Sequence, residues 1–484
     1  MPINKLKSRP FIKTLLTAGA EVFVVGGAVR DAIMNRPIKD LDIVVRGLPF
    51  EKIISALKCF GHCNLVGRSF GVIKFRAHDD LEQEFDIALP RTEVSTGEGH
   101  KDFAVNADPN LPLVADLARR DFTINAMARN LATDELIDPF NGKTDIAAKR
   151  IKVVFPDAFK EDPLRLLRAI QFAARFDFSI EPDTFSQMQE NAALIRSVST
   201  ERIIDEIRKL FLAPKPSIGF DLMRACGLLP IVFPDVHNMI GVTQPLKNNE
   251  DVYTHTMKVL NAARAASELE KPGDLTIMFS ALFHDAGKPK TRNEAEGDPA
   301  RVTFYNHQHA SKHLARKWLK TFKATTIGVD PERVVHLVEH HMFETKAFDN
   351  EKAVRRFINK VGKDSIFDLL DLRLADKKGG RFPNKVFGML QLRDKIREEI
   401  ERKAPFSPKD LALDGHGIMA MGFAPGPIIG TVQRFLMEKV LDEPALNVKE
   451  TLQDLVRDNE TALRSPEGLP PVNLEAQEQE AEES

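Results

Sequence analysis

Short apolar runs separated by turn residues characterise residues 1–135, whereas apolar residues at three- and four-residue spacing dominate from about 145 to 400. The first pattern is typical of buried strands and the second of amphipathic helices. We therefore predict an α+β chain that begins with a small mixed portion and continues as an almost wholly helical one. The predicted strands are residues 22–25, 42–45, 71–75 and 84–88.

Prolines and shifts in composition divide the helical portion further. Prolines cluster at residues 214–216 and 230–234, a histidine-rich segment spans about 250–378, and a unit with several glycines and prolines follows at 405–459. Residues 466–484 are acidic without an apolar period, which is typical of disorder. The predicted parts are a head at 1–145, a helical neck and body at 146–240, a histidine-rich domain at 241–400, a helical C-terminal unit at 401–462 and a disordered acidic tail at 463–484.

The composition is that of a folded protein of a reducing compartment. Hydrophobic residues make up 43% of the 484 residues, enough for several packed cores. Three cysteines, Cys59, Cys63 and Cys226, are too few for a disulfide framework. No apolar run approaches the roughly 18 residues of a membrane span, so we expect a cytoplasmic protein without membrane contact. Since the formal net charge is −2, nucleic-acid binding would depend on local basic patches.

Paired glycines and paired aspartates flank the first two predicted strands. Gly26 and Gly27 lie between strand 22–25 and a segment of helical character, where backbone N–H groups can approach an anion. Asp40 and Asp42 open the second strand, and residues two apart on a strand point to the same face. Carboxylates that hold Mg²⁺ beside a phosphate cradle indicate nucleotidyl transfer. The motif lacks the endings of a P-loop and of a dinucleotide fingerprint, and the remaining alternative is a set of ordinary turn residues.

A string of charged residues at 119–126 predicts a second part of this site. We expect these residues to open an amphipathic helix, with Arg120 on a triphosphate and Asp121 and Asn125 near a ribose. Alternatively, Asp121 is a plain helix cap and the arginines are surface charge. The preceding residues 92–115 contain two glycines and two prolines with few periodic apolar positions. We expect them to form a long mobile loop near the active site.

The segment 161–176 predicts a helix with an unusual basic face. Asp162 before a proline is a good helix start, and Arg165, Arg168 and Arg175 fall on one stripe that calls for an anion unless it is solvated. Aspartate accepts hydrogen bonds and arginine donates them. Asp162 and Arg165 can therefore match the amine and ring nitrogen of cytosine or adenine, whereas uracil and guanine would leave both groups mispaired.

These motifs, in this order and spacing, resemble the bacterial, class II branch of the tRNA nucleotidyltransferase and poly(A) polymerase family. The matching strings are Gly26-Gly27-Ala28-Val29-Arg30-Asp31, Asp40-Leu41-Asp42, Arg119-Arg120-Asp121 with Asn125-Ala126, Asp138-Pro139-Phe140-Asn141-Gly142, and Glu161-Asp162-Pro163-Leu164-Arg165 with Arg168. The resemblance covers about residues 15–235. It implies a small head like that of DNA polymerase beta, followed by helical neck, body and tail parts.

The resemblance also implies roles for individual residues. Asp40 and Asp42 would be catalytic and bind Mg²⁺, and Asp86 is the candidate for a third carboxylate. Asp162 and Arg165 would read the base, with Arg168 supporting them. The residues implied in nucleotide binding are Gly26, Gly27, Arg30, Asp31, Arg120, Asp121, Asn125, Asp162, Arg165 and Arg168. The implied substrates are tRNA, CTP and ATP.

The histidine-rich segment contains a second motif. Ala281-Leu282-Phe283-His284-Asp285-Ala286-Gly287-Lys288 resembles the HD metal-phosphohydrolase superfamily. Imidazoles and carboxylates together suit divalent transition metals. The resemblance implies a divalent metal held by His255, His284, Asp285 and Asp376, and metal-assisted hydrolysis of a phosphate ester. His307 and either His340 or His341 match the extra ligands of two-metal members, and an idle metal scaffold is the alternative.

We therefore expect an enzyme that adds CCA to tRNA 3′ ends and carries an HD domain. A poly(A) polymerase, or a partial enzyme that adds only CC or only A, would have the same head motifs. An alternative from a different functional class is an RNA-binding protein whose main activity is the HD hydrolase. The glycines and prolines of residues 405–460 resemble the C-terminal unit that follows the HD domain in some of these enzymes, where tRNA binding and plain helix capping are equally compatible with the pattern.

Overall fold

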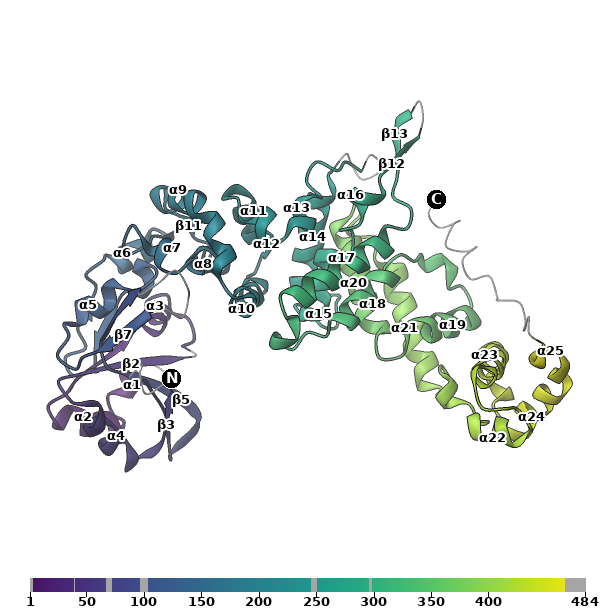
Figure 1. Ribbon diagram of the computed structural model, residues 1–484, viewed down its shortest axis with the longest axis horizontal. Coiled ribbons are helices and arrows are strands. Elements are labelled where there is room, and N and C mark those ends of the chain that lie inside the picture. The colour runs from purple at the N-terminus through teal and green to yellow at the C-terminus, as the bar shows by residue number, and fades with distance from the viewer. Residues whose placement is uncertain are drawn as a thin grey trace. The chain divides into compact units, whose positions relative to one another are not determined.

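The computed structural model describes residues 3–38, 40–66, 72–95, 103–244, 250–295 and 298–465 (Figure 1). The chain forms two compact units, Met1–Val232 and Phe233–Ser484. The first unit holds the sheet and the second is almost entirely helical. In the described residues, no helix combines the length and apolar character that a membrane span requires.

A seven-stranded sheet forms the base of the first unit, in the order β3-β4-β5-β2-β1-β8-β9. The pair β2–β5 is parallel, whereas the other neighbours are antiparallel. The apolar side chains of β1 are buried along the whole strand after its first residue. The strands of the unit are β1 (Glu21–Val25), β2 (Leu41–Arg46), β3 (Gly61–Val66), β4 (Val72–Ala77), β5 (Asp80–Ala88), β6 (Arg91–Ser95), β7 (Phe103–Ala107), β8 (Ala128–Asn130), β9 (Leu136–Ile137), β10 (Arg150–Ile151) and β11 (Ser179–Ile180).

Helices cover this sheet and continue beyond it. The 3-10 turns of the unit are η1 (Thr123–Asn125) and η2 (Ala192–Ser197). The helices are α1 (Ile3–Leu6), α2 (Pro10–Thr17), α3 (Gly27–Ile33), α4 (Phe50–Lys58), α5 (Leu113–Ala118), α6 (Gly142–Ala147), α7 (Ala158–Glu161), α8 (Arg165–Phe176), α9 (Pro182–Asn191), α10 (Thr200–Phe211), α11 (Ser217–Ala225) and α12 (Leu229–Val232).

The predicted strands are confirmed, with one residue outside the described part. Strands 22–25 and 42–45 coincide with β1 and β2, and 84–88 is the second half of β5. Strand 71–75 corresponds to β4, which begins at Val72, and Gly71 lies outside the described residues. The sequence pattern did not predict β3, whose residues Gly-His-Cys-Asn-Leu-Val lack a continuous apolar run.

Two expectations about residues 92–126 were wrong. Residues 92–115 do not form one long loop, because β6 and β7 pair as an antiparallel hairpin and α5 follows. Residues 96–102, and with them the expected mobility, lie outside the described part. No amphipathic helix opens within the described residues 119–126. Phe122 bridges to Val153, η1 lasts three residues, and Ala128 joins the sheet, so the backbone is drawn into strand pairing.

The second unit is built on helices that pack around α15. Helices α14, α17, α18 and α20 all contact it, and α14 and α20 contact each other. The helices are α13 (Pro234–His237), α14 (Val252–Ala265), α15 (Leu275–Phe283), α16 (Lys288–Thr291), α17 (His307–Thr321), α18 (Pro331–His340), α19 (Glu351–Val361), α20 (Ile366–Gly379), α21 (Phe387–Glu401), α22 (Gly415–Ala420), α23 (Pro427–Asp442), α24 (Lys449–Asp458) and α25 (Glu460–Arg464).

Smaller elements and a separate core complete this unit. A hairpin of β12 (Asn293–Ala295) and β13 (Asp298–Thr303) interrupts the helical pattern and was not predicted. The 3-10 turns are η4 (Ala324–Ile327), η5 (Thr345–Ala347), η6 (Pro408–Asp410) and η7 (Pro444–Leu446). Helices α22 to α25 enclose their own apolar cluster, which includes Leu413, Leu436 and Leu452. Helix α25 extends to Arg464, so the predicted tail does not begin at 463, and residues 466–484 lie outside the described part.

Candidate functional sites

Three carboxylates lie on or next to the central strands β2 and β5 of the first unit, at the end of the sheet where β2 begins. This end of the sheet is called the carboxylate edge below. Val25 is the partner of Asp42 across β1 and β2, and Asp42 is in turn the partner of Asp86 across β2 and β5. Asp40 is exposed and immediately precedes β2. In-register neighbours of a sheet project to the same face, so Asp42 and Asp86 lie side by side. The strand register thus places Asp86 beside Asp42, one of the two aspartates that the sequence identified.

The environment of Asp42 suits a bound cation. Burial raises the pKa of Asp42, the charge of Arg120 opposes this shift, and the nearby charges of Asp86 and Asp40 raise the pKa further. Carboxylates that repel one another in a partly buried position are stabilised by a divalent cation, and oxygen ligands are those that Mg²⁺ prefers. Lys74 already lies 3.1 Å from Asp86 and balances part of this charge. The residues present therefore fit Mg²⁺.

Gly26 allows Arg120 to reach the same edge. Its φ is +71°, and a Cβ at this position would lie 2.6 Å from Nη1 of Arg120 and 3.7 Å from Oδ2 of Asp42. Asp116, which is 1% exposed, accepts a hydrogen bond from Nη2 of Arg120 at 3.3 Å and holds the guanidinium there. The sequence did not single out Asp116, because an aspartate four residues before an arginine on a helix is common.

The glycine turn also leads into a helix start. The N–H of Gly26 donates to the carbonyl oxygen of Met127 at 3.0 Å, so this amide is committed to the fold. Helix α3 begins at Gly27, and the amides of a first helical turn have no acceptor within their own helix. The part of the predicted phosphate cradle that remains suited to an anion is therefore the first turn from Gly27 onwards.

Five of the residues predicted to bind the nucleotide form one network of buried and half-buried side chains. Arg30 pairs with Asp31 at 2.8 Å and donates to Oδ1 of Asn125 at 2.6 Å. Asn125 donates to Asp121 at 3.0 Å, and Arg168 donates to the other oxygen of Asp121 at 2.8 and 2.6 Å. The structure thus brings these residues together, but through contacts with one another. Direct contact of Arg30, Asp121 or Asn125 with a nucleotide remains a prediction.

The charges of this network are compensated inside the protein. Burial alone would raise the pKa of Asp121, but the charge of Arg168 and the hydrogen bonds it receives outweigh burial and lower it. Burial lowers the pKa of Arg30, whose guanidinium lies 4.7 Å from the ring centroid of Phe176. The network joins α3, η1 and α8 and thereby fixes the positions of these three elements around the glycine turn.

The two residues predicted to read the base lie close in sequence but face different partners. Helix α8 begins at Arg165, and Asp162 ends the short α7 in an extended conformation, as expected for a residue before proline. Its Oδ1 accepts from the N–H of Leu164 at 3.2 Å, so Asp162 caps the turn that leads into α8, as predicted. Nη2 of Arg202 lies 2.8 Å from Asp162. Arg165 is 7% exposed and donates to Glu161 at 2.8 Å and to the carbonyl oxygen of Arg119 at 2.9 Å.

The anion that the basic stripe requires is supplied partly by the protein itself. Arg165 pairs with Glu161, and Arg168 pairs with Asp121 at 2.6 Å and lies 3.7 Å from Glu206. The stripe on α8 is therefore neither a solvated face nor a simple phosphate surface. Its repulsion is relieved by carboxylates of other elements: Glu161 stands four residues before Arg165, whereas Asp121 and Glu206 are distant in the sequence.

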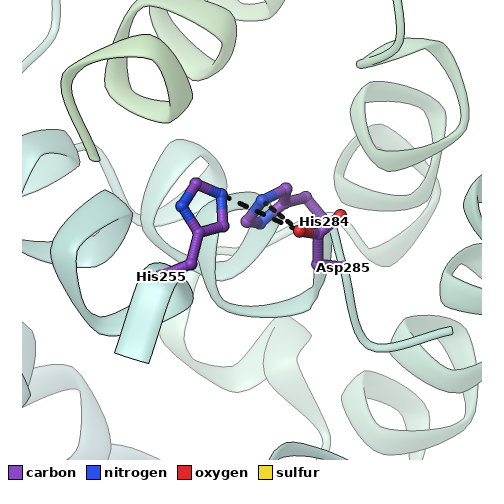
Figure 2. A group of neighbouring side chains, drawn as sticks. All are labelled: His255, His284 and Asp285. Atoms are coloured by element: carbon purple, nitrogen blue, oxygen red, sulfur yellow. Dashed lines mark ion pairs between the residues drawn. The ribbon is translucent and has the colours of Figure 1, made fainter. Parts of the chain in front are cut away.

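A cluster of histidines and aspartates lies inside the second unit. Nε2 of His255 is 3.0 Å from Asp376 and 3.8 Å from Asp285, and Nε2 of His284 is 3.3 Å from Asp285. Figure 2 shows the imidazoles of His255 and His284 beside the carboxylate of Asp285. The four residues predicted as ligands are thus brought together, and the first three form a group with metal-ligand spacing.

A second group with metal-ligand spacing shares Asp285. It comprises Asp285, His307 and His341, with Nε2 of His307 3.2 Å and Nε2 of His341 3.8 Å from Oδ1 of Asp285. His255 and His284 approach the other oxygen, Oδ2. His340 instead directs Nδ1 at the carbonyl oxygen of His336, 2.9 Å away. The structure therefore selects His341 from the two histidines that the sequence left open.

The hydrogen bonds of the imidazoles prepare them as ligands. Nδ1 of His284, His307 and His341 lies 2.8, 2.9 and 2.7 Å from a backbone carbonyl oxygen, so the N–H sits on Nδ1 and the lone pair of Nε2 faces the cluster. Nε2 of His284 is buried and has no hydrogen-bond partner in the described part of the chain. Burial, followed by the charges of His307 and His284, lowers the pKa of His341 well below its ordinary value. A His341 that burial keeps neutral and a buried Nε2 of His284 without a hydrogen-bond partner in the described residues fit a divalent metal.

Close helix packing and two cations complete the cluster. A Cβ on Gly379 would lie 2.7 Å from the backbone nitrogen of Val259, so this glycine lets α20 approach α14 and bring Asp376 to His255. Arg373 donates to Asp376 at 2.5 Å, and Nζ of Lys288 lies 2.7 Å from Asp285. Sequence reasoning quoted Lys288 only as part of the motif and missed Arg373.

Comparisons with protein families match three parts of the chain. The profile described as "Poly A polymerase head domain" matches residues 22–152, the profile "Probable RNA and SrmB-binding site of polymerase A" matches 177–240, and the profile "HD domain" matches 252–378. The matches cover the carboxylate edge, the helices after α8 and the histidine cluster. They fall in the order in which the sequence placed the head, the body and the HD domain.

Two curated relatives carry the same printed name. The "Multifunctional CCA protein" of Nitrosococcus oceani is 40% identical over 275 residues, which cover 56% of this chain and 64% of its own length. That of Thioalkalivibrio sulfidiphilus is 37% identical over 301 residues, which cover 61% of this chain and 68% of its own length. The similarity thus spans about two thirds of these relatives.

Solved structures share the fold along nearly the whole chain. The CCA-adding enzyme of Bacillus stearothermophilus, solved in complex with CTP, has a TM-score of 0.66 at 22% identity, covering 95% of this chain and 100% of that one. The enzyme of Thermotoga maritima, solved with tRNA, has a TM-score of 0.56 at 21% identity, covering 95% and 98%. The predicted fold class, a mixed head followed by helical parts with an HD domain, is confirmed.

Proposed function

Because the chain belongs to the tRNA nucleotidyltransferase and poly(A) polymerase family, we propose that it adds CCA to tRNA 3′ ends from CTP and ATP without a template. The observation that carries this proposal is the edge at which Asp42 and Asp86 lie side by side, with Gly26 and Arg120 next to them. The relatives named for CCA addition support it. We place this activity in the cytoplasm.

The residues at the sheet edge would divide the chemistry between them. Asp40, Asp42 and Asp86 would hold Mg²⁺, which when bound stabilises the charge of a transferring phosphate and activates the attacking hydroxyl. Arg120, held by Asp116, would neutralise the triphosphate. The first turn of α3 would direct its amides at a phosphate oxygen. The network behind the turn would keep these groups in register.

Base selection would require two exchanges of partner. Asp162 would have to release Arg202 to accept from the exocyclic amine of cytosine or adenine. Arg165 would have to give up one of its present acceptors, Glu161 or the carbonyl oxygen of Arg119, to donate to the ring nitrogen. Uracil and guanine would leave both groups unpaired, and site polar groups left without partners can reject an analogue by about 10⁴-fold.

One assay tests this function. The protein is incubated with tRNA lacking its 3′ end, Mg²⁺ and each labelled nucleotide singly and in pairs. We expect incorporation of CTP and then ATP that stops after three residues, and loss of addition in Asp42→Ala with tRNA binding retained. Unlimited ATP addition would make the chain a poly(A) polymerase, and addition of CC or A alone would make it a partial enzyme. Unaltered discrimination against UTP in Arg165→Ala would refute the base-reading roles.

A second activity is proposed for the histidine cluster. His255, His284, Asp285 and Asp376 would hold one divalent ion, and Asp285, His307 and His341 a second. A bound divalent ion supplies Lewis-acid activation for hydrolysis of a phosphate ester. We expect metal-dependent hydrolysis of bis(p-nitrophenyl) phosphate that His284→Ala abolishes while CCA addition is unchanged. Hydrolysis that persists in this variant would contradict the assignment.

We also retain the predicted division of the chain as a proposal. It places a head at 1–145, a neck and body at 146–240, the HD domain at 241–400 and a helical C-terminal unit at 401–462. The separate apolar cluster of α22 to α25 supports the last boundary. Limited proteolysis with mass spectrometry of the fragments tests it, and cuts that fall inside these ranges but not between them would count against it.

A further inference from the structure

Two exposed phenylalanines lie near each other along the chain in the second unit. Phe382 is 53% exposed and lies between α20 and α21, and Phe387 is 71% exposed and is the first residue of α21. Exposing an aromatic ring costs free energy that burial would recover, so paired exposed rings on one segment are typical of binding surfaces. This segment follows Asp376 of the histidine cluster by six residues at Phe382. Six residues span at most about 20 Å, which bounds the distance between Phe382 and that cluster.

A turn holds two cations against the first ring. The N–H of Lys385 donates to the carbonyl oxygen of Phe382 at 3.0 Å, with Pro383 as the second residue of the turn. Nζ of Lys385 lies 4.4 Å and Cζ of Arg381 5.1 Å from the ring centroid of Phe382. Both cations are exposed, and among the described residues the side-chain contact recorded for each is with the Phe382 ring and not with a carboxylate. Their charge is therefore available to an anionic partner.

A small pocket is lined in part by the residue that follows the second phenylalanine in the chain. Its volume is about 270 Å³, and its lining includes Gly388, next to Phe387, and the side chains of Lys346, Gln391 and Lys395. Lys346 and Lys395 are exposed, and Nζ of Lys395 contacts only backbone carbonyl oxygens among its hydrogen-bond partners. The volume is below that of a drug-sized site and suits a single base or phosphate. The exposed rings, the two cations and one wall of the pocket thus lie on a single stretch of the chain, residues 381–388.

We propose that this aromatic and cationic surface, formed by residues 381–387 and the pocket at Gly388, binds single-stranded RNA. Aromatic faces stack unpaired bases and cations neutralise the backbone, and this combination distinguishes a single strand from a duplex, whose bases are already stacked. Acidic groups of a protein partner would also match the cations, but a pocket of about 270 Å³ that suits a single base or phosphate favours RNA. The proposal concerns binding in the second unit and needs neither of the two proposed activities.

Fluorescence anisotropy of a labelled single-stranded RNA dodecamer tests the proposal on the full chain. We expect Phe382→Ala/Phe387→Ala to weaken binding at least about ten-fold, since each lost stacking contact costs roughly 5- to 150-fold. Leu81→Ala, which removes a side chain 60% exposed on the first unit, is the matched control and should bind normally. Because all the substituted side chains are exposed, the melting temperature should not change.

Salt dependence separates the cations from the rings. The slope of log K against log salt is about −0.7 per neutralised phosphate of a single strand, so Arg381→Ala/Lys385→Ala should flatten it by about 1.4. Lys363→Ala, an exposed lysine elsewhere in this unit, should leave it unchanged. Equal affinity in the wild type and both double variants would overturn the proposal, as would equal affinity for a matched duplex. So would sedimentation in which the phenylalanines hold two copies of the chain together while RNA affinity stays constant.

Discussion

Asp86 lies directly beside Asp42 in the parallel pair of β5 and β2. The two carboxylates therefore share one face of the sheet although 44 positions separate them along the chain (86 minus 42). A third acidic residue, Asp40, influences Asp42 from the start of β2. The candidate catalytic edge is thus built by strand register, to which the local motif contributes only two of the three groups.

If Asp86 helps to hold Mg²⁺, removing its charge should weaken the metal more than the fold. We expect Asp86→Asn to lower kcat for CCA addition by about 10- to 100-fold, the usual effect of losing a group that supports a metal site, and to raise the Mg²⁺ concentration at half-maximal rate. Initial rates across a Mg²⁺ titration measure both. Glu84→Gln is the matched control, because Glu84 also pairs with Lys74, at 2.7 Å. Equal kcat and equal Mg²⁺ dependence in the two variants would show that both residues act only through their ion pairs with Lys74.

Gly26→Ala should disable the site through Arg120. The new Cβ would lie 2.6 Å from Nη1 of Arg120, so the guanidinium must move away from the carboxylates. A displacement of about 1 Å in an active site can cost about 10²-fold in rate, and we expect a loss of this size in kcat/KM for CTP. Gly19→Ala isolates backbone strain, because Gly19 also has a positive φ (+89°) but meets nothing within 4 Å. Comparable losses in both variants would assign the effect to strain alone.

The number of bound metal ions should reflect the two groups of ligands in the histidine cluster. After loading with Mn²⁺ and desalting, inductively coupled plasma mass spectrometry should find fewer ions in His284→Ala and His341→Ala than in the wild type, and fewest in Asp285→Ala, whose carboxylate faces both groups. His340→Ala should retain the wild-type content, because His340 faces His336. Saturation at about 100 times Kd should stabilise the wild type by about 2.7 kcal/mol. A loss in His340→Ala as large as in His341→Ala would contradict this geometry.

Low pH should destabilise the first unit because Asp121 loses its charge. Because the folded-state pKa of this carboxyl lies below its ordinary value of 3.8, the charged pair with Arg168 stabilises the fold fully above that value and less as pH falls through the folded pKa. We expect Asp121→Asn to lower the free energy of unfolding at pH 7 and to flatten its decline below pH 4, as measured by urea denaturation. Asp157→Asn, at a carboxyl 71% exposed, should do neither. An unchanged acid limb in Asp121→Asn would exclude this linkage.

Local sequence predicted the parts whose partners lie nearby in the chain. Apolar runs gave β1 and β2 because a buried strand must be apolar whichever strand it pairs with. The same approach was wrong for residues 121–126, where strand pairing and a bridge to Val153 displaced the expected helix. It also missed the hairpin of β6 and β7, although its strands are neighbours in the chain, because neither strand is a continuous apolar run. Propensity is weak compared with the contacts made in strand pairing.

The sequence by itself determined which chemistry the chain carries: two aspartates at a strand start, a glycine turn, and an adjacent histidine and aspartate after an apolar helix. Only the tertiary structure decided which distant groups complete each site. Strand register selected Asp86, and helix rotation selected His341 over His340, since successive helical residues point about 100° apart and only one can face Asp285. Spacing along the sequence determines which way side chains point within one helix or strand. Which helices and strands contact one another depends on tertiary packing, which no single segment encodes.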